Sequence, residues 1–263
     1  EIFRIKRLDL LNVDYQNNNQ ELKINSNHAL ILFRIVQECI NNVIKHSQSK
    51  DLQLLVIDSP ENLNIEINDN GVGFNSDLEN TARLCFIGQN AVKSGQTAAG
   101  LMGEITNGQG QIIIISGHEE NPSLQQRADG FNKEISISYP QINNLGIRYA
   151  YDDDWVAEKI TDEILDKYPN LKGIYITGSG VFGVCKSLQK ANKIKDIKII
   201  ANDFINDNIQ LLSNGTINFL IGQDAYTQGY QSIMLLFHKL FDNKNPDSKF
   251  AYTDIVIKNR FNI

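Results

Sequence analysis

Two patterns of apolar and polar residues divide the chain near Phe74 and Asn75. From residue 75 onward, short apolar runs alternate with stretches in which apolar residues recur at helical spacing. The runs that we expect to form strands are 112–116, 146–150, 174–177, 197–201 and 219–222. Helical patterns follow them, beginning near residues 123, 155 and 181, passing through 211–212 and covering 226–241. Because continuous apolar runs are typical of strands covered on both faces, this pattern predicts an α/β fold with a parallel, doubly wound sheet.

Residues 1–74 follow a different pattern, with one helix and two short strands. Apolar residues recur at helical spacing between about Asn27 and His46, which predicts an amphipathic helix. Two β-like runs, 52–57 and 63–67, are separated by an Asp-Ser-Pro-Glu-Asn link whose composition is typical of turns. We therefore expect a β-hairpin, and with the helix an α+β segment that precedes the parallel sheet.

Composition and charge narrow the class of protein. The chain has 263 residues, of which 41% are apolar and 21% charged, so it is long enough for one large domain or two small ones, and a disordered or fibrous chain is excluded. The net charge of −6 argues against contact with nucleic acid, and no apolar run approaches the roughly 18 residues of a membrane span. Three distant cysteines (Cys39, Cys85 and Cys185) form neither a disulfide framework nor a zinc motif, and we expect buried, reduced thiols.

The start of the chain gives little information about its compartment. The first residue is Glu1 rather than Met, and no signal peptide follows it. We expect a fragment or a processed chain. Its location is left open with a slight preference for the cytoplasm, and a homodimer is allowed for.

The first group of candidate residues lies on the predicted helix of the N-terminal segment. Glu38 and Asn42 are four residues apart and so share one helix face. The amide oxygen of an Asn can ligate Mg²⁺, which can bridge phosphate oxygens, and a Glu carboxylate can polarise a water molecule. Lys45 could add positive charge near a phosphate. The alternative is an amphipathic helix in an Asn-rich segment, without a ligand.

A second motif directly follows the predicted hairpin. In Asp-Asn-Gly-Val-Gly-Phe (69–74), the Asp69 carboxylate could accept a hydrogen bond from adenine, and Gly71 and Gly73 would let the backbone approach a ligand. By itself the motif is also a good turn. The two motifs together resemble the N box and first glycine box of the histidine-kinase ATP-binding domain, a Bergerat-fold ATPase, over about residues 30–74. The resemblance implies Mg-ATP as cofactor, with Asn42 as magnesium ligand, Glu38 as catalytic carboxylate and Asp69 as adenine contact.

The N-terminal segment lacks other parts of that family's site. No ATP lid or second glycine box follows Phe74, and no phospho-acceptor histidine motif precedes the predicted helix. We therefore interpret residues 1–74 as a partial, incomplete Bergerat-like segment. Histidine kinase activity is not expected from it.

The segment from residue 75 to 263 carries an ordered set of weaker motifs. They are the stretches 75–90 and 93–99, Gln-Arg-Ala-Asp-Gly-Phe at 126–131, the strand entry at 168–175, Asn-Asp at 202–203 and Gly-Gln-Asp at 222–224. Together they resemble the type I periplasmic-binding-protein fold, nearest to the effector domains of LacI-type regulators and related sugar-binding proteins. The resemblance implies a two-lobed sensor with its ligand in the cleft between the lobes. About 100 residues of the first lobe are absent ahead of Asn75, so residues 75–263 would lack most of that lobe.

Polar residues follow several of the predicted strands, where ligands of open α/β sheets bind. Carboxylates and amides there can hydrogen-bond the hydroxyls of a carbohydrate, and an aromatic ring can cover its apolar face. The candidate ligand contacts at these strand ends are Asp152, Asp153, Trp155, Thr177, Asp203 and Gln223. By resemblance, Asp203 and Gln223 are the strongest of them. Gln125 stands where many family members carry an Arg that clamps the sugar, which argues against an anionic ligand.

Each of these residues also has a purely structural interpretation. Thr177 and Asp153 could simply cap helices, Trp155 could pack on its own helix, and Arg127 is interpreted as structural.

The predicted helix 226–241 normally packs on the first lobe, so its apolar face requires another partner, for which the N-terminal segment is a candidate.

Three functions remain open from the sequence. The first is a non-catalytic sensor for a small molecule, with a neutral sugar preferred, in signal transduction or transcription regulation. The second is the ATP-binding module of a two-component histidine kinase. The third is an engineered or mis-assembled chimera without activity, suggested by the change of pattern at Phe74-Asn75. The sequence shows no catalytic triad or metal-ligand spacing.

Overall fold

The chain forms two compact units, which are described separately. The computed structural model describes residues 12–18, 32–33, 36–37, 51–58, 63–68 and 84–263. The first unit contains Glu1–Asn75 with Leu236–Asp242, and the second contains Ser76–Leu235 with Asn243–Ile263.

The smaller unit contains a three-stranded sheet in the order β1-β2-β3. Its strands are β1 (Asn12–Asn17), β2 (Asp51–Asp58) and β3 (Leu63–Asn68). The antiparallel pairing of β2 with β3 confirms the predicted hairpin, whereas β1, which is parallel to β2, was not predicted. Of the predicted helix 27–46 the structure describes residues 32–33 and 36–37, and these are helical.

The larger unit is built on a six-stranded sheet in the order β11-β9-β8-β7-β5-β6. The strands are β5 (Gly110–Ser116), β6 (Ile142–Tyr149), β7 (Leu171–Ile176), β8 (Lys198–Asn202), β9 (Phe219–Gln223) and β11 (Ile255–Lys258). All neighbouring pairs are parallel except β11 with β9, which is antiparallel. The predicted parallel α/β fold is therefore confirmed, with one antiparallel edge strand that the sequence pattern missed.

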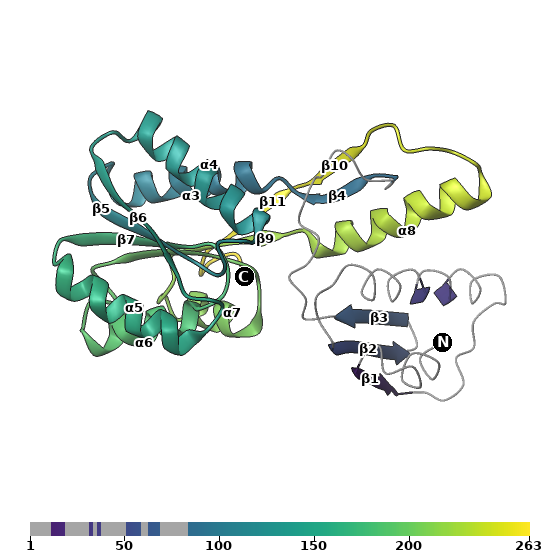
Figure 1. Cartoon of the computed structure of the whole chain (residues 1–263), viewed down its shortest axis with the longest axis horizontal. Coiled ribbons are helices and arrows are strands. Elements are labelled where there is room, and N and C mark those ends of the chain that lie inside the picture. Colours follow the sequence, from purple (N-terminus) through teal and green to yellow (C-terminus); the bar gives the residue numbers. More distant parts are fainter. Residues whose placement is uncertain (1–11, 19–31, 34–35, 38–50, 59–62, 69–83) are drawn as a thin grey trace. The chain divides into compact units, whose positions relative to one another are not determined.

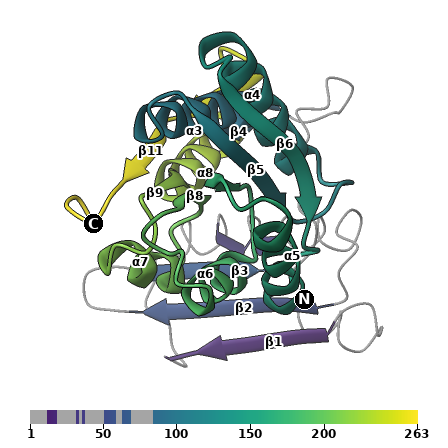
Figure 2. The ribbon, with the colours of Figure 1, turned by 90° about the vertical axis from the view of Figure 1, so that its left-hand side faces the viewer.

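Helices cover both faces of this sheet, as Figures 1 and 2 show. On one face lie α3 (Ala91–Ile105) and α4 (Pro122–Ser138), and on the other lie α5 (Asp154–Lys167), α6 (Val181–Lys190) and α7 (Asn206–Ser213). The central position of β5 explains why its sequence is continuously apolar. Ile112 and Ile114 belong to the core cluster under α3 and α4, while Ile113 and Ile115 belong to the cluster on the other face. Alternate side chains of a strand point to opposite faces, so a strand buried on both needs an unbroken apolar run.

The two helices α3 and α4 pack with their backbones in close contact. A Cβ added at Gly95 of α3 would lie 1.9 Å from the carbonyl oxygen of Arg127, and one added at Gly130 of α4 would lie 2.1 Å from that of Val92. Only glycine allows this approach, and it fixes where α4 places Arg127 at the edge of the sheet.

A second, two-stranded parallel sheet is formed by β4 (Phe86–Gln89) and β10 (Phe250–Thr253). The chain passes between this sheet and the six-stranded one three times, from β4 through α3 to β5, from β9 through α8 to β10, and from β10 into β11. The long helix α8 (Ala225–Phe241) follows β9, as predicted, and none of its residues is buried. No helix within the described ranges is long and apolar enough to cross a membrane.

Candidate functional site

Polar side chains gather where β7, β8 and β9 end. The Gln223 side-chain amide donates a hydrogen bond of 3.2 Å to Oδ1 of Asp203. The other carboxylate oxygen, Oδ2, lies 3.8 Å from Nη1 of Arg127, and the same guanidinium nitrogen donates a 2.6 Å hydrogen bond to the carbonyl oxygen of Thr177. The structure thus brings together Asp203 and Gln223, the two residues that the sequence indicated most strongly, and adds Arg127 to them.

The backbone holds the Asp203 carboxylate in place while leaving it accessible. Asp203 has a φ of +70°, in the left-handed region, and its side chain is 40% exposed. Its amide donates to the carbonyl of Ile221, and the side-chain amide of Asn208 donates to the carbonyls of Asn202 and Asp203. Asp and Asn adopt the left-handed region more readily than other residues with a Cβ. The loop therefore presents a preorganised acceptor for a ligand.

Thr177 contributes its backbone rather than its side chain. The residue is fully buried, and its hydroxyl donates a 2.8 Å hydrogen bond to Oγ of Ser116. The hydroxyl is therefore engaged by the neighbouring strand end, and a ligand contact of Thr177 stays a prediction. Its carbonyl oxygen instead orients the guanidinium of Arg127.

Asp153 is the N-cap of α5 in this structure. Its carboxylate accepts hydrogen bonds from the backbone amides of Trp155 and Val156, at 2.8 and 3.0 Å. These bonds satisfy helix amides that would otherwise lack partners, so the structure shows the capping alternative, while a ligand contact of Asp153 stays a prediction.

The other predicted contacts near the end of β6 lie on an open surface. Asp152 has a φ of +58° and its carboxylate lies 3.8 Å from Nε2 of His118. Trp155 is 69% exposed, with the ammonium of Lys159 5.9 Å from the centre of its ring, so it does not pack in the core. Gln125 accepts a hydrogen bond from the Tyr149 hydroxyl and donates one to Asp129.

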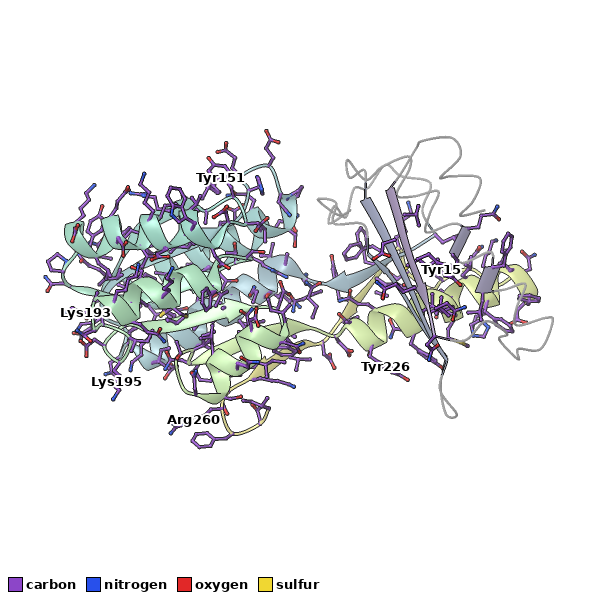
Figure 3. All side chains as sticks on the ribbon, turned by 90° about the horizontal axis from the view of Figure 1, so that it is seen from below. Tyr15, Tyr151, Lys193, Lys195, Tyr226 and Arg260 are labelled. Atoms are coloured by element: carbon purple, nitrogen blue, oxygen red, sulfur yellow. The ribbon has the colours of Figure 1, made fainter. Side chains whose placement is uncertain are left out.

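The site lies at one end of the six-stranded sheet. Figure 3 shows Tyr151, exposed in the loop after β6, and Tyr226, at the start of α8. Lys193 and Lys195, in the loop that leads into β8, lie at the end away from Tyr226. The carboxyl and amino ends of the strands are therefore well separated, and substitutions at the amino ends provide controls for the site.

The crossover strand β4 is tied to the same region by Gln89. Its side-chain amide donates a 2.9 Å hydrogen bond to the carbonyl of Gly222, the neighbour of Gln223. Gln89 is buried, and its Oε1 makes no hydrogen bond among the residues that the structure describes. The strand through which the chain enters the large sheet thus contacts the residue beside the candidate site.

Burial shifts the pKa of two titratable groups in the larger unit. Burial raises the pKa of the Tyr175 phenol, which stays protonated and donates to Oδ1 of Asn202. Burial also raises the pKa of the Cys185 thiol to about 12, so it is not a nucleophile at neutral pH. Cys185 is buried as expected and Cys85 is half-buried. Within the described parts of the chain, no group of His, Cys, Asp and Glu is arranged to hold a metal ion.

The candidate ATP-binding residues are not among those described. Glu38, Asn42, Lys45, Asp69, Gly71 and Gly73 all lie outside the described residues. Cys39 lies there too.

Comparison with known proteins identifies the class of the chain. Residues 65–244 match the model of the family described as periplasmic binding protein domain. This match covers more than half of the chain, which therefore belongs to that family.

Two solved structures show the same fold. The arabinose binding protein from Geobacillus stearothermophilus superimposes with a TM-score of 0.65 and 24% identity, over 70% of this chain and 66% of that one. A solute binding protein of an ABC transporter from Burkholderia graminis, in complex with D-arabinose, gives a TM-score of 0.66 and 27% identity, over 72% and 66%. The chain thus spans just under two thirds of the length of these relatives.

A short match links the chain to a different protein. It is 34% identical over 64 residues to the sensor histidine kinase ComP of Bacillus subtilis (strain 168), which is 24% of this chain and 8% of that protein. The chain spans only this small part of the kinase.

Proposed function

We propose that the larger unit binds a neutral sugar at the carboxyl ends of β8 and β9, with Asp203 and Gln223 as its main contacts. The observation that carries the proposal is the 3.2 Å hydrogen bond between these two side chains at an accessible edge of the sheet. A sugar hydroxyl both donates and accepts hydrogen bonds, so a carboxylate beside an amide suits two neighbouring hydroxyls. Relatives described as an arabinose binding protein and as a D-arabinose complex support a sugar as ligand.

The proposed role of the bound sugar is that of a signal rather than a substrate. The described part of the site holds acceptors and donors but no nucleophile paired with a base, which suits binding without chemistry. The similarity of 64 residues to a sensor histidine kinase supports a place in signal transduction. Ligand binding would act by shifting the chain toward the conformation that binds the sugar better.

Titration calorimetry of the full chain tests the sugar site. We expect saturable heat with D-arabinose or another sugar from a panel of neutral pentoses and hexoses. Asp203→Ala should weaken that binding about 10-fold to 100-fold, because hydrogen bonds to a charged group contribute about 1.5–3 kcal/mol. The matched control is Asp196→Ala, which removes the same charge at the exposed amino end of β8. Absence of binding by the unmodified chain, or an equal loss in both variants, would reject the proposal.

We also propose, as a second candidate function, that residues 1–74 contribute a histidine-kinase-type ATP-binding segment. It is favoured by the 64-residue similarity to the sensor kinase and by the confirmed hairpin of β2 and β3. Under this proposal the boundary between the two parts lies near Phe74-Asn75.

Thermal denaturation with and without Mg-ATP tests this second function. A stabilising ligand raises the melting temperature. Mg-ATP should raise it in the unmodified chain and in Asn41→Ala, but not in Asn42→Ala. No change in the unmodified chain rejects ATP binding. Sequencing the gene across codons 70–80 then shows whether the junction was made by recombination.

A further inference from the structure

The buried guanidinium of Arg127 is held by a hydrogen bond from its Nη1, and its backbone is held by close packing of α4 on α3. Arg127 is 3% exposed, and its Nη1 donates the 2.6 Å hydrogen bond to the carbonyl of Thr177. Gly95 lets the backbone of α3 lie against the carbonyl of Arg127 itself. The position of its positive charge is therefore fixed by the fold, before any ligand binds.

Arg127 balances the charge of Asp203 without occupying its acceptors. The distance from Nη1 to Oδ2 of Asp203 is 3.8 Å, close enough for a strong interaction of charges but too long for a hydrogen bond. Oδ1 of Asp203 accepts from Gln223, and Oδ2 accepts no hydrogen bond from the described residues. The carboxylate thus keeps a free acceptor while its charge is compensated by a neighbour.

We propose that Arg127 is a specificity-determining residue of this site, which restricts it to uncharged sugars and excludes amino sugars. The inference rests on the proposed sugar-binding function. A ligand ammonium placed beside Asp203 would also be repelled by the guanidinium, and a ligand carboxylate would be repelled by Asp203. A hydroxyl meets neither penalty and can donate to Oδ2.

Loss of Arg127 should change the relative affinities for neutral and cationic ligands in a predictable direction. The Asp203 carboxylate would become an uncompensated negative charge at an accessible site, which favours a cationic ligand. A residue that only supports the fold would lower affinity for all ligands together. The ratio of affinities for a sugar and its amine-bearing analogue therefore separates a specificity role from a structural one.

The experiment measures dissociation constants for D-glucose and D-glucosamine, and for D-galactose and D-galactosamine, with the full chain. The unmodified chain should prefer the neutral member of each pair. Arg127→Met should shift the ratio of affinities at least tenfold toward the amino sugar, whereas Arg127→Lys, which keeps the charge, should shift it much less. The control is Arg148→Met, which removes an exposed arginine from β6 and should leave the ratio unchanged.

A second variant covers the case in which Arg127→Met does not fold. Asp203→Asn keeps the size of the side chain and leaves the Arg127 charge uncompensated. It should raise the affinity for D-glucuronate relative to D-glucose at least fivefold. An unchanged ratio in Arg127→Met, or in Asp203→Asn, overturns the role of Arg127 while sugar binding stands. If the unmodified chain binds none of these sugars, this inference and the proposed function both fail.

Discussion

The carboxyl ends of β6 and β8 carry similar acidic side chains and use them differently. After β6, Asp153 caps α5 by binding two of its backbone amides. After β8, α7 has Ile205 as its N-cap and no side-chain cap, so the nearby Asp203 is left to face Gln223 and Arg127. The comparison teaches that an acidic residue at a strand end stays available to a ligand where the following helix does not use it as a cap.

The largest expected effect, on both stability and sugar binding, comes from a substitution that pushes apart the residues at the end of β9. A Cβ added at Gly222 would lie 2.1 Å from the ring of Phe204, the residue after Asp203. Gly222→Ala should therefore lower the free energy of unfolding by about 1–3 kcal/mol and weaken sugar binding. Urea denaturation and calorimetry measure the two effects. Gly100→Ala in α3, whose Cβ would meet no atom within 4 Å, is the control and should not destabilise the chain.

Removal of the cap at the end of β6 should lower stability without changing the affinity for the sugar. Asp153→Ala should lower the free energy of unfolding by about 1 kcal/mol, because two helix amides lose their acceptor. The dissociation constant for the sugar should change by less than twofold. Urea denaturation and calorimetry measure the two effects. A tenfold loss of affinity would show that Asp153 contributes to the ligand site.

The smallest expected effect is a pH dependence of stability that arises from Glu158, on the side of the sheet covered by α5 and α6. Hydrogen bonds from Lys186 and Lys190 hold the pKa of Glu158 below its ordinary value of 4.5. A carboxylate whose pKa is lower in the folded state stabilises the fold above its unfolded pKa and loses this contribution as pH falls through the folded pKa. Stability should therefore decline below about pH 4.5, and less steeply in Glu158→Gln. Melting temperatures between pH 6 and pH 3 measure the difference, and identical slopes contradict it.

The strands were predictable wherever a continuous apolar run forced burial on both faces. The run in β5 indicated a central strand because nothing else accounts for so many adjacent apolar residues. The edge strand β11 and the Asn-rich β1 were missed, since each carries a weaker pattern; in β1, Val13 is buried between polar neighbours.

Part of the site was predictable for a related reason. Ligands of open α/β sheets bind at the carboxyl ends of the strands, and the family resemblance indicated Asp203 and Gln223 there. The pairing of β8 with β9 brings the two residues together. The position of the Arg127 guanidinium was not predictable, because its partner at Thr177 lies 50 residues away in the chain and is a backbone carbonyl, which has no sequence signature. Whether Thr177 would use its hydroxyl or its carbonyl was likewise undetermined by sequence.

The left-handed backbone of Asp203 also limits which residues can replace it. Most residues with a Cβ enter that region at a cost of about 1–2 kcal/mol, so a typical mutation at position 203 removes the carboxylate and strains the loop at once. Gln223 lies in a strand and Arg127 in a helix, and neither residue has a left-handed backbone. Substitution of Asp203 therefore carries a backbone cost that substitution of Gln223 or Arg127 does not.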